Sequence, residues 1–228
     1  MVTAHPDDVD FGMGGTVATW TAAGVEVAYC VCTDGDAGGF DRAVSRPAMA
    51  ATRRDEQRAA AKTLGVEHVE FLGYPDGRLA PSIELRRDIS RVIRQLRPER
   101  VVCQSPERRW DRIFASHPDH LAAGEAAVCA VYPDARNPFA HPELLGSEGL
   151  EPHTVGELWL MASGRPDHFV DVTDASERKL AALRCHASQL PDVPGMEERV
   201  RGWLAATGAE AGMAEGRMAE AFQVVHTG

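Results

Sequence analysis

Short apolar runs alternate with longer amphipathic stretches along most of this chain. The apolar runs are rich in β-branched residues and predict strands, whereas the longer stretches carry apolar residues at helical spacing. The expected strands are residues 2–4, 25–32, 69–72 and 101–104, and the expected helices are residues 15–23, 49–64, 82–95 and 121–131. This alternation is typical of βαβ units around a parallel sheet.

The C-terminal part of the chain has a different pattern. Residues 133–153 are rich in proline and predict a surface loop beside a substrate cleft. Residues 157–161 and 168–172 predict two further strands, which we expect to form a hairpin added to the parallel sheet. A helix should follow to about residue 190, and the Ala-, Glu- and Met-rich residues 197–225 predict a last helix. The expected fold is therefore α/β, with a Rossmann-like, mostly parallel sheet flanked by helices in a single domain, residues 1–228.

Composition and charge narrow the class of protein. A hydrophobic share of 44% and a charged share of 25% are ordinary for a globular domain, and the formal net charge of −10 argues against nucleic-acid or anionic-membrane surfaces. No apolar run approaches the roughly 20 residues of a membrane span, and no secretory signal is expected. Most of the five cysteines lie in apolar runs and predict buried reduced thiols, so a cytoplasmic location is expected.

Two matching tetrapeptides carry the candidate chemistry, His5-Pro6-Asp7-Asp8 and His117-Pro118-Asp119-His120. Each follows a predicted strand, and parallel sheets bind ligands outside the carboxyl ends of their strands. His5, Asp8 and His120 would make a two-His, one-carboxylate set, which binds a catalytic divalent metal and leaves one position open for water. A metal-dependent hydrolase is therefore the leading interpretation.

The other residues of the two tetrapeptides would supply acid–base groups beside the metal. Asp7 and Asp8 are adjacent, so after a strand one can ligate while the other faces the water. His117 and His120 lie three residues apart at a helix start, so one ring can ligate while the other reaches the substrate. Asp119 could hold the non-ligating ring in its orientation.

Each motif alone has a plainer interpretation. His-Pro-Asp is a natural turn sequence, and an aspartate before a helix is often only its N-cap. Two such motifs at strand ends, both rich in histidine, favour the metal site. The segment Gly12-x-Gly14-Gly15 resembles a dinucleotide-binding turn but lacks the full glycine spacing, so helix packing explains it better. A nucleotide-binding Rossmann protein, which would bind a cofactor and no metal, remains an alternative.

At these residues the chain resembles the LmbE-like (PIG-L) family of zinc-dependent N-acetylglucosaminyl deacetylases. The matching segments extend over most of the chain and are residues 4–12, 14–16, 53–56, 71–77, 117–120 and 186–189. The two His-Pro-Asp motifs are the most specific part of the match. The short first strand and residues 112–116 depart from the family pattern.

The resemblance implies a role for each motif residue. It implies three zinc ligands, namely His5, Asp8 and His120. Asp7 would be the general base, and His117 would stabilise the oxyanion with Asp119 as its orienting partner. Zinc is the implied metal, and a site of nitrogen and oxygen ligands also accepts Fe²⁺ or Co²⁺.

The resemblance also implies the substrate, a small molecule that carries an N-acetylglucosamine group and loses its acetyl group by amide hydrolysis. Arg53 matches a family position near the substrate, and Asp36 and Asp76 fall where family members contact sugar hydroxyls. The plainer interpretations are a solvated helix charge for Arg53 and turn residues for the two aspartates. A non-catalytic zinc- or sugar-binding module of the same fold is the second alternative. Monomer and homo-oligomer are both left open.

Overall fold

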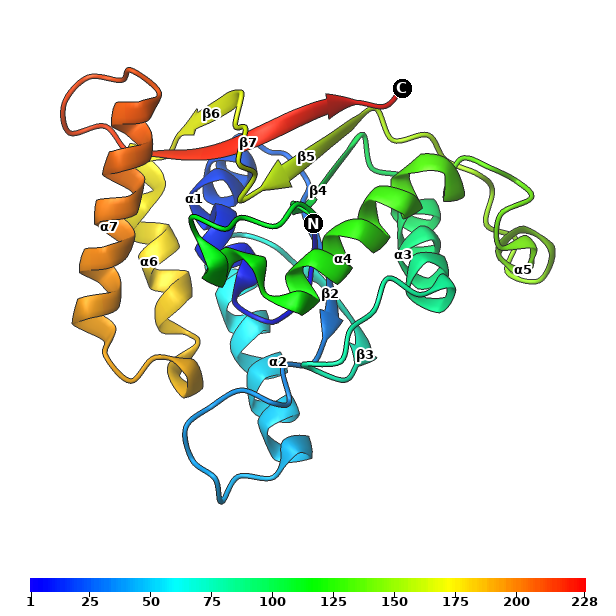
Figure 1. Cartoon of the computed structure of the whole chain (residues 1–228), viewed down its shortest axis with the longest axis horizontal. Helices are drawn as coiled ribbons and strands as arrows, with labels where there is room; N and C mark the ends of the chain where they lie inside the picture. Colours follow the sequence, from blue (N-terminus) through cyan, green and yellow to red (C-terminus); the bar gives the residue numbers. More distant parts are fainter.

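Seven strands form one sheet in the computed structural model, which describes residues 1–228 (Figure 1). Their order across the sheet is β3-β2-β1-β4-β5-β7-β6. The strands are β1 (Val2–Thr3), β2 (Ala28–Thr33), β3 (His68–Tyr74), β4 (Arg100–Gln104), β5 (Glu157–Met161), β6 (His168–Asp171) and β7 (Ala219–His226). β1 to β5 run parallel, and β7 is antiparallel to both of its neighbours. The expected mostly parallel α/β sheet is confirmed.

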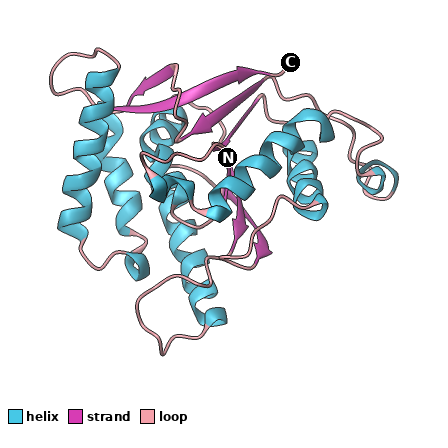
Figure 2. Cartoon of the chain, viewed as in Figure 1, coloured by secondary structure: helices cyan, strands magenta, loops and turns pink.

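Helices cover both faces of this sheet, as Figure 2 shows. They are α1 (Asp8–Ala22), α2 (Arg46–Thr63), α3 (Ile83–Leu96), α4 (Pro118–Cys129), α5 (Pro142–Gly146), α6 (Ser176–Arg184) and α7 (Val193–Glu210). One apolar cluster joins the sheet to α1, α2, α6 and α7, and a second joins it to α3 and α4. None of the helices combines the length and the apolar character that a bilayer crossing requires.

Alternate residues of the central strands face opposite helical layers, because side chains alternate across a strand. In β5, Trp159 packs in the cluster with α1, α2, α6 and α7, whereas its neighbours Leu158 and Leu160 pack in the cluster with α3 and α4. Cys30 and Cys32 of β2 share this second cluster as free, buried thiols. The two residues are two positions apart, so their side chains lie on the same face of the strand.

The strand order reverses beside β1. β2 and β3 lie on one side of this strand, and β4 and β5 lie on the other. The segment that follows β1 and the start of α4, which follows β4, therefore meet at the carboxyl edge of the sheet. Ligands bind in the crevice at such a switch point. The two His-Pro-Asp motifs occupy these two segments.

Helix α1 begins earlier than its sequence suggests. The expected start was residue 15, but the helix runs from Asp8 and is broken at Met13, where φ is −153° and ψ is 23°. Asp7 precedes the helix with a φ of 86°. The glycines that indicated a later start mark the break instead, since glycine weakens the helix interior.

A buried ion pair forms hydrogen bonds with the backbone groups that lose their helical partners at the break in α1. The Glu220 carboxylate, on β7, accepts hydrogen bonds from the backbone N–H of Gly15 at 3.0 Å and of Thr16 at 2.7 Å. The Lys179 ammonium, on α6, donates to the Phe11 carbonyl and to Glu220, each at 2.6 Å. The negative charge therefore lies at the start of the second half of α1 and the positive charge at the end of the first half, as the helix dipole favours.

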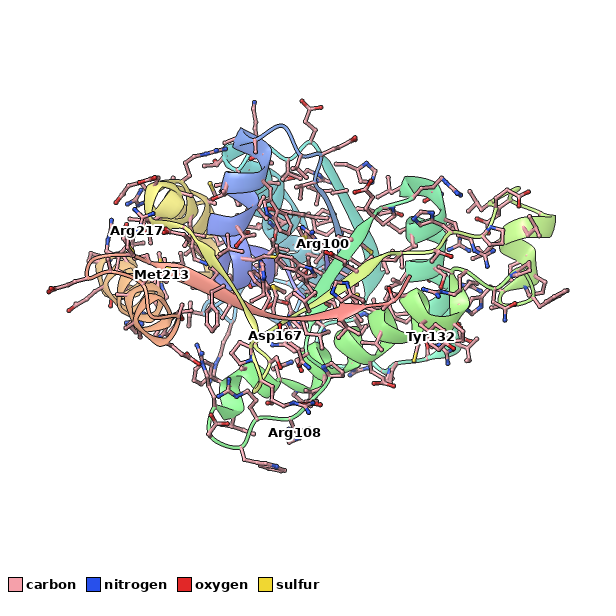
Figure 3. All side chains as sticks on the ribbon, turned by 90° about the horizontal axis from the view of Figure 1, so that it is seen from above. Arg100, Arg108, Tyr132, Asp167, Met213 and Arg217 are labelled. Carbon is pink, nitrogen blue, oxygen red and sulfur yellow. The ribbon has the colours of Figure 1, made fainter.

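Two expectations for the C-terminal part are wrong. The predicted last helix over 197–225 ends at Glu210, and Ala219–His226 form strand β7 instead. β5 and β6 do not pair with each other as a hairpin, because β7 lies between them and pairs with both. Seen from above, β7 extends from the turn that holds Met213 and Arg217 and passes Asp167 (Figure 3). Phe222, Val224 and Val225 favour an extended conformation, and the segment pairs with a strand on each of its edges.

Candidate active site

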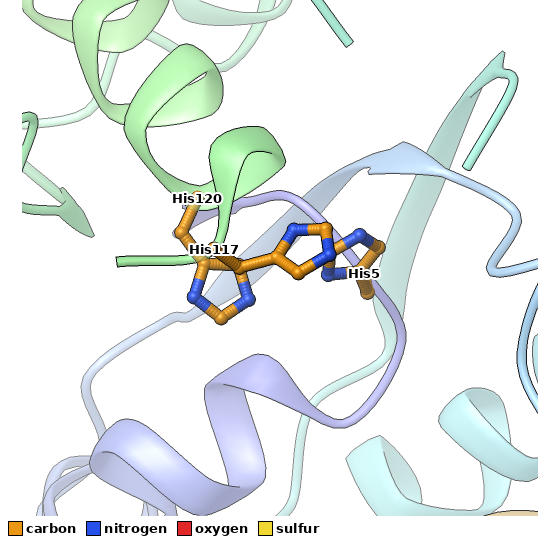
Figure 4. A group of neighbouring side chains, drawn as sticks. All are labelled: His5, His117 and His120. Atoms are coloured by element: carbon orange, nitrogen blue, oxygen red, sulfur yellow. The ribbon is translucent and has the colours of Figure 1, made fainter. Parts of the chain in front are cut away.

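The side chains of three histidines gather at the carboxyl edge of the sheet. His5 follows β1, and His117 and His120 come from the start of α4 (Figure 4). The ring centroids are 5.0 Å apart for His5 and His117, 5.2 Å for His5 and His120, and 5.3 Å for His117 and His120. One nitrogen of each ring lies within 4.8 Å of the other two. Three imidazoles at this separation are suited to share one metal ion.

Local sequence holds the two motifs in place. His117 is the N-cap of α4, and Pro118 supplies its first helical residue, where a proline costs no hydrogen bond. The Ala4 N–H donates to the Gln104 side-chain oxygen at 3.0 Å, which ties the end of β1 to the end of β4. Gly124 lets α4 approach this edge closely, because a Cβ at this position would lie 2.3 Å from the Gln104 carbonyl oxygen.

Three carboxylates surround the His5 ring, which is buried. Its Nδ1 lies 3.4 Å from Asp8 Oδ2, and its Nε2 lies 3.1 Å from Asp76 Oδ1 and 3.2 Å from Asp119 Oδ2. The other Asp8 oxygen lies 3.0 Å from His120 Nε2. The structure therefore brings His5, Asp8 and His120 together, as the sequence predicts, and adds two acidic residues to the cluster.

This acidic surrounding stabilises positive charge. Burial alone would lower the pKa of His5, but hydrogen bonds to Asp119, Asp76 and Asp8 outweigh it and raise the pKa to about 12. Burial would raise the pKa of Asp8, but His120 and His5 hold it well below its ordinary value. A position that favours an imidazolium so strongly also favours a bound divalent cation.

Asp7 lies beside this cluster in a left-handed backbone conformation, with φ at 86°. Its carboxylate accepts a hydrogen bond from the Arg53 guanidinium at 3.2 Å and is 18% exposed. Burial raises the pKa of Asp7 to about 6, against the opposing effect of the Arg53 charge. A carboxylate with a pKa near neutrality is suited to accept and return a proton.

His117 is exposed, and one of its nitrogens is already committed. Its Nδ1 accepts a hydrogen bond from the Asp119 backbone N–H at 3.1 Å, which leaves the proton of the neutral ring on Nε2. Burial and the neighbouring His5 and His120 lower the pKa of His117, which favours the neutral ring. The ring can therefore donate a hydrogen bond from Nε2.

The expected pairing of the Asp119 carboxylate with His117 is wrong. The carboxylate instead contacts His5 Nε2 and accepts hydrogen bonds from the backbone N–H of Gly77 at 2.7 Å and of Leu79 at 3.2 Å. Asp119 points toward β1 and the loop after β3, because His117 at the N-cap uses the Asp119 backbone and not its side chain. The carboxylate thus orients His5.

The three predicted substrate residues form one connected group. Arg53 is only 5% exposed, so the interpretation as a solvated helix charge is wrong; it donates to the Gly35 carbonyl at 3.0 Å and lies 3.7 Å from Asp76. Asp36 accepts from the Asp76 backbone N–H at 2.9 Å and from Arg46 at 2.6 Å. Asp36 and Asp76 therefore hold the loops after β2 and β3 against each other.

Comparison with known proteins places the chain in a family. The sequence profile of PIG-L, described as GlcNAc-PI de-N-acetylase, matches residues 1–131. Diacetylchitobiose deacetylase from Thermococcus kodakarensis is 36% identical over 191 residues, which are 84% of this chain and 69% of that relative. The chain belongs to the PIG-L family.

Further PIG-L relatives are similar over most of the molecule. The solved structure of N,N'-diacetylchitobiose deacetylase from Pyrococcus horikoshii, in complex with its inhibitor MPG, has a TM-score of 0.90 and 34% identity, and the match covers 98% of this chain and 82% of that chain. A probable N-acetyl-alpha-D-glucosaminyl L-malate deacetylase 2 from Bacillus anthracis is 30% identical over 197 residues, covering 83% of this chain and 80% of the relative. These relatives are N-deacetylases named for small N-acetylated sugars.

The PIG-L family is metal-dependent, and the residues of this chain fit a metal. Two groups have ligand atoms that all lie within 4.8 Å of one another, namely His5, His117 and His120, and His5, Asp76 and Asp119. His5 belongs to both groups, and each of its ring nitrogens lies close to at least one carboxylate. A set of imidazole and carboxylate donors with this spacing accepts zinc and related divalent ions.

Three residues around this PIG-L site were not assigned a role from the sequence. Gln57, Asp10 and His186 are all fully buried and form hydrogen bonds to one another behind Asp7. His186 belongs to the late family motif, but a sequence motif does not reveal which buried group it contacts. Gln57 lies four residues after Arg53, and this helical spacing is the one signal that would place both on the same face of α2.

Proposed function

We propose that this protein is a metal-dependent N-deacetylase that hydrolyses the acetamide of a small N-acetylglucosamine-containing molecule. The observation that carries the proposal is the convergence of both His-Pro-Asp motifs on one point, with His5, Asp8 and His120 in contact and Asp7 and His117 beside them. Relatives that share this family are named deacetylases of such sugars. Residues 1–228 would act as one deacetylase domain, and the free thiols suit the reducing cytoplasm as its location.

His5, Asp8 and His120 would hold the metal. Asp8 supports this set because its two oxygens contact the two imidazoles. His117 is a poorer ligand, since its Nδ1 lone pair already accepts the Asp119 N–H. Asp119 would then orient the His5 ring from the opposite nitrogen, as carboxylates behind metal-bound histidines do. When bound, zinc supplies a Lewis acid that polarises the acetamide carbonyl and lowers the pKa of a water molecule; Fe²⁺ or Co²⁺ would fit the same donors.

Asp7 would act as the general base. Its carboxylate accepts the proton of the attacking water, and the pKa of about 6 lets it do so near neutral pH. Arg53 holds the carboxylate in place and keeps its pKa from rising further. As the C–N bond breaks, Asp7 returns the proton to the leaving nitrogen, so that the products are acetate and the free amino sugar.

His117 would stabilise the negative charge that develops on the acetyl oxygen. The neutral ring has its proton on Nε2, and the hydrogen bond from the Asp119 backbone keeps it there. A positioned donor of this kind contributes about 10²–10³ in kcat.

Arg53 and Asp76 would line the inner wall of the sugar site, since Arg53 lies 3.2 Å from the Asp7 carboxylate and Asp76 lies 3.1 Å from the His5 ring. Asp36 would act through Asp76, whose backbone N–H it accepts. A small N-acetylated amino sugar is the partner that these polar groups suit. The relatives differ in the rest of the sugar, so the loops after β2 and β4 would select among them. The segment 133–153, which was expected beside a substrate cleft, reaches the amino end of β4 instead, where the His153 ring lies 2.8 Å from the Pro98 carbonyl oxygen.

The first experiment measures metal content together with amine release from a panel of N-acetylglucosaminides. About one zinc or iron per chain with chelator-sensitive amine release supports the proposal. Metal binding without turnover on any member would favour the non-catalytic module, and no metal after reconstitution would exclude the metal site.

The Asp7→Asn variant tests the base. The amide keeps the size of the side chain but cannot accept the proton, so kcat should fall by about 10²–10⁴ while the metal content stays unchanged. Undiminished turnover would refute the role of Asp7.

A further inference from the structure

A chain of buried hydrogen bonds ends on the backbone of Asp7. The Asp7 N–H donates to Gln57 Oε1 at 2.7 Å, and the Gln57 amide nitrogen donates to Asp10 Oδ2 at 2.8 Å. His186 Nε2 lies 2.8 Å from the same Asp10 oxygen. The side chains of Gln57, Asp10 and His186 are completely inaccessible to solvent, so water cannot replace these bonds.

The direction of every bond in this chain is fixed by chemistry. A backbone N–H can only donate, so the Gln57 atom that faces Asp7 is the oxygen and the amide nitrogen must face Asp10. A carboxylate oxygen accepts, so His186 carries a proton on Nε2 and donates to Asp10. Each residue therefore has one orientation that satisfies its neighbours: Gln57 accepts from Asp7 and donates to Asp10, and Asp10 also accepts from His186.

Two side chains of helix α2 form hydrogen bonds with the two ends of the peptide unit between Pro6 and Asp7. The Arg53 guanidinium donates to the Pro6 carbonyl at 2.7 Å, and Gln57 accepts the Asp7 N–H. Arg53 and Gln57 are four residues apart and so lie on one face of the helix. Rotation of this peptide plane would break both bonds, and the φ of 86° at Asp7 depends on the orientation of the plane. Left-handed backbone at a non-glycine residue is unfavourable and persists only where its surroundings enforce it.

The buried chain is not optimised for stability alone. Asp10 Oδ1 and His186 Nδ1 are buried without a hydrogen-bond partner. Unpaired polar atoms in a core are destabilising, and apolar residues of similar volume would avoid that penalty. A purely structural role does not explain why these polar residues occupy the core. A role in positioning an active-site residue does explain it.

We propose that His186, Asp10 and Gln57 are positioning residues that lock Asp7 in its left-handed conformation, with its carboxylate turned toward the metal cluster. The inference rests on the proposed function, because Asp7 is the base in that function. Gln57 acts directly on the Asp7 peptide, Asp10 orients Gln57, and His186 orients Asp10. Without this chain the peptide unit can rotate, and the base leaves its reactive position.

Two variants at residue 57 separate positioning from simple stability. Gln57→Met fills the space but accepts no hydrogen bond, so kcat should fall about 10–100-fold, as for a misplaced catalytic group. The value of KM and the metal content should change by no more than about threefold, since neither the metal ligands nor the sugar contacts are altered. Gln57→Glu can share a proton with Asp10 and still accept the Asp7 N–H, so it should retain kcat within about threefold. Its melting temperature should nevertheless fall, because two carboxyl groups then lie side by side in the core.

His186→Phe and a matched control complete the series. His186→Phe removes one of the two donors to Asp10 and should lower kcat less than Gln57→Met does, again with KM nearly unchanged. Gln95→Met makes the same substitution as the test variant on the exposed side of α3 and should change neither quantity. If kcat per folded molecule stays within about twofold in Gln57→Met, or if kcat follows the melting temperature across all variants, the positioning role is refuted.

A readout that needs no turnover distinguishes this inference from the proposed function. In ¹⁵N-labelled protein the Asp7 amide proton should exchange slowly in the wild type and in Gln57→Glu, and at least about tenfold faster in Gln57→Met. Protection of this amide in wild-type protein that hydrolyses no acetamide would refute the deacetylase function and leave the peptide lock intact. Fast exchange in an active wild type would refute the lock and leave the function intact.

Discussion

Replacing Lys179 with methionine should destabilise the protein more than any surface substitution. Lys179 is 1% exposed and Glu220 is 4% exposed, and their charged atoms lie 2.6 Å apart. Lys179→Met keeps most of the side-chain volume but removes the positive charge. It leaves the Glu220 carboxylate buried and the Phe11 carbonyl without its donor.

The magnitude follows from what remains bonded. Removal of one partner from a buried ion pair costs about 3–5 kcal/mol. The lower end applies here, because Glu220 still accepts the backbone N–H groups of Gly15 and Thr16. About 3 kcal/mol in a domain of this size corresponds to a fall in Tm of about 6–12 °C.

Calorimetry and guanidinium unfolding measure this change, with two further variants as references. The double variant Lys179→Met, Glu220→Gln removes both charges while an amide oxygen still accepts from Gly15 and Thr16, so it should recover about half of the loss. Arg184→Met breaks an exposed pair with Glu197 and should leave Tm nearly unchanged. If Lys179→Met unfolds within about 1 kcal/mol of the wild type, then the charge is effectively solvated and the reasoning from burial is refuted.

Three further predictions concern the site. Asp119→Asn should weaken metal binding about 10–100-fold, since its carboxylate orients His5; metal affinity within about twofold of the wild type would refute this role. Arg53→Met should shift the acidic limb of the kcat/KM profile to higher pH, because Arg53 opposes the effect of burial that raises the pKa of Asp7 to about 6; a shift to lower pH would contradict this. Removal of the metal by a chelator should abolish amine release and lower Tm, and zinc should restore both. If Tm is the same with and without zinc, these residues bind no metal.

The parallel strands and the helices between them could be predicted from the sequence, because their local hydrophobic pattern matches the face that each buries in the fold. Residues 157–161 were predicted as a strand with the bounds that β5 has. Strand β7 was not predicted, because Ala219–His226 were taken together with the Ala-, Glu- and Met-rich residues before them, although Phe222, Val224 and Val225 favour a strand. The start of α1 was missed because the glycines that weaken the helix are compensated by Lys179 and Glu220, more than 160 residues away.

The candidate site was predictable where topology alone brings residues together. Parallel strands end at one edge, so the motifs after β1 and β4 had to meet, and His5, Asp8 and His120 do contact one another. The side-chain direction of Asp119 was not predictable, since it depends on backbone N–H groups in the loop after β3. A motif states which residues lie near a site, whereas their partners depend on loop conformation.

The position of β7 has a consequence for synthesis of the protein on the ribosome. Glu220 accepts a hydrogen bond from Gly15 across 205 residues of sequence, and β5 and β6 acquire their shared neighbour only when β7 has emerged. The nascent chain therefore carries an open gap in its sheet and an uncapped break next to the Asp7–Asp8 turn until residues Ala219–His226 have been synthesised. Such long-range pairing is slow and leaves strand edges exposed in the meantime. The turn that carries Asp7 and Asp8 therefore stays incomplete until β7 has paired with β5 and β6.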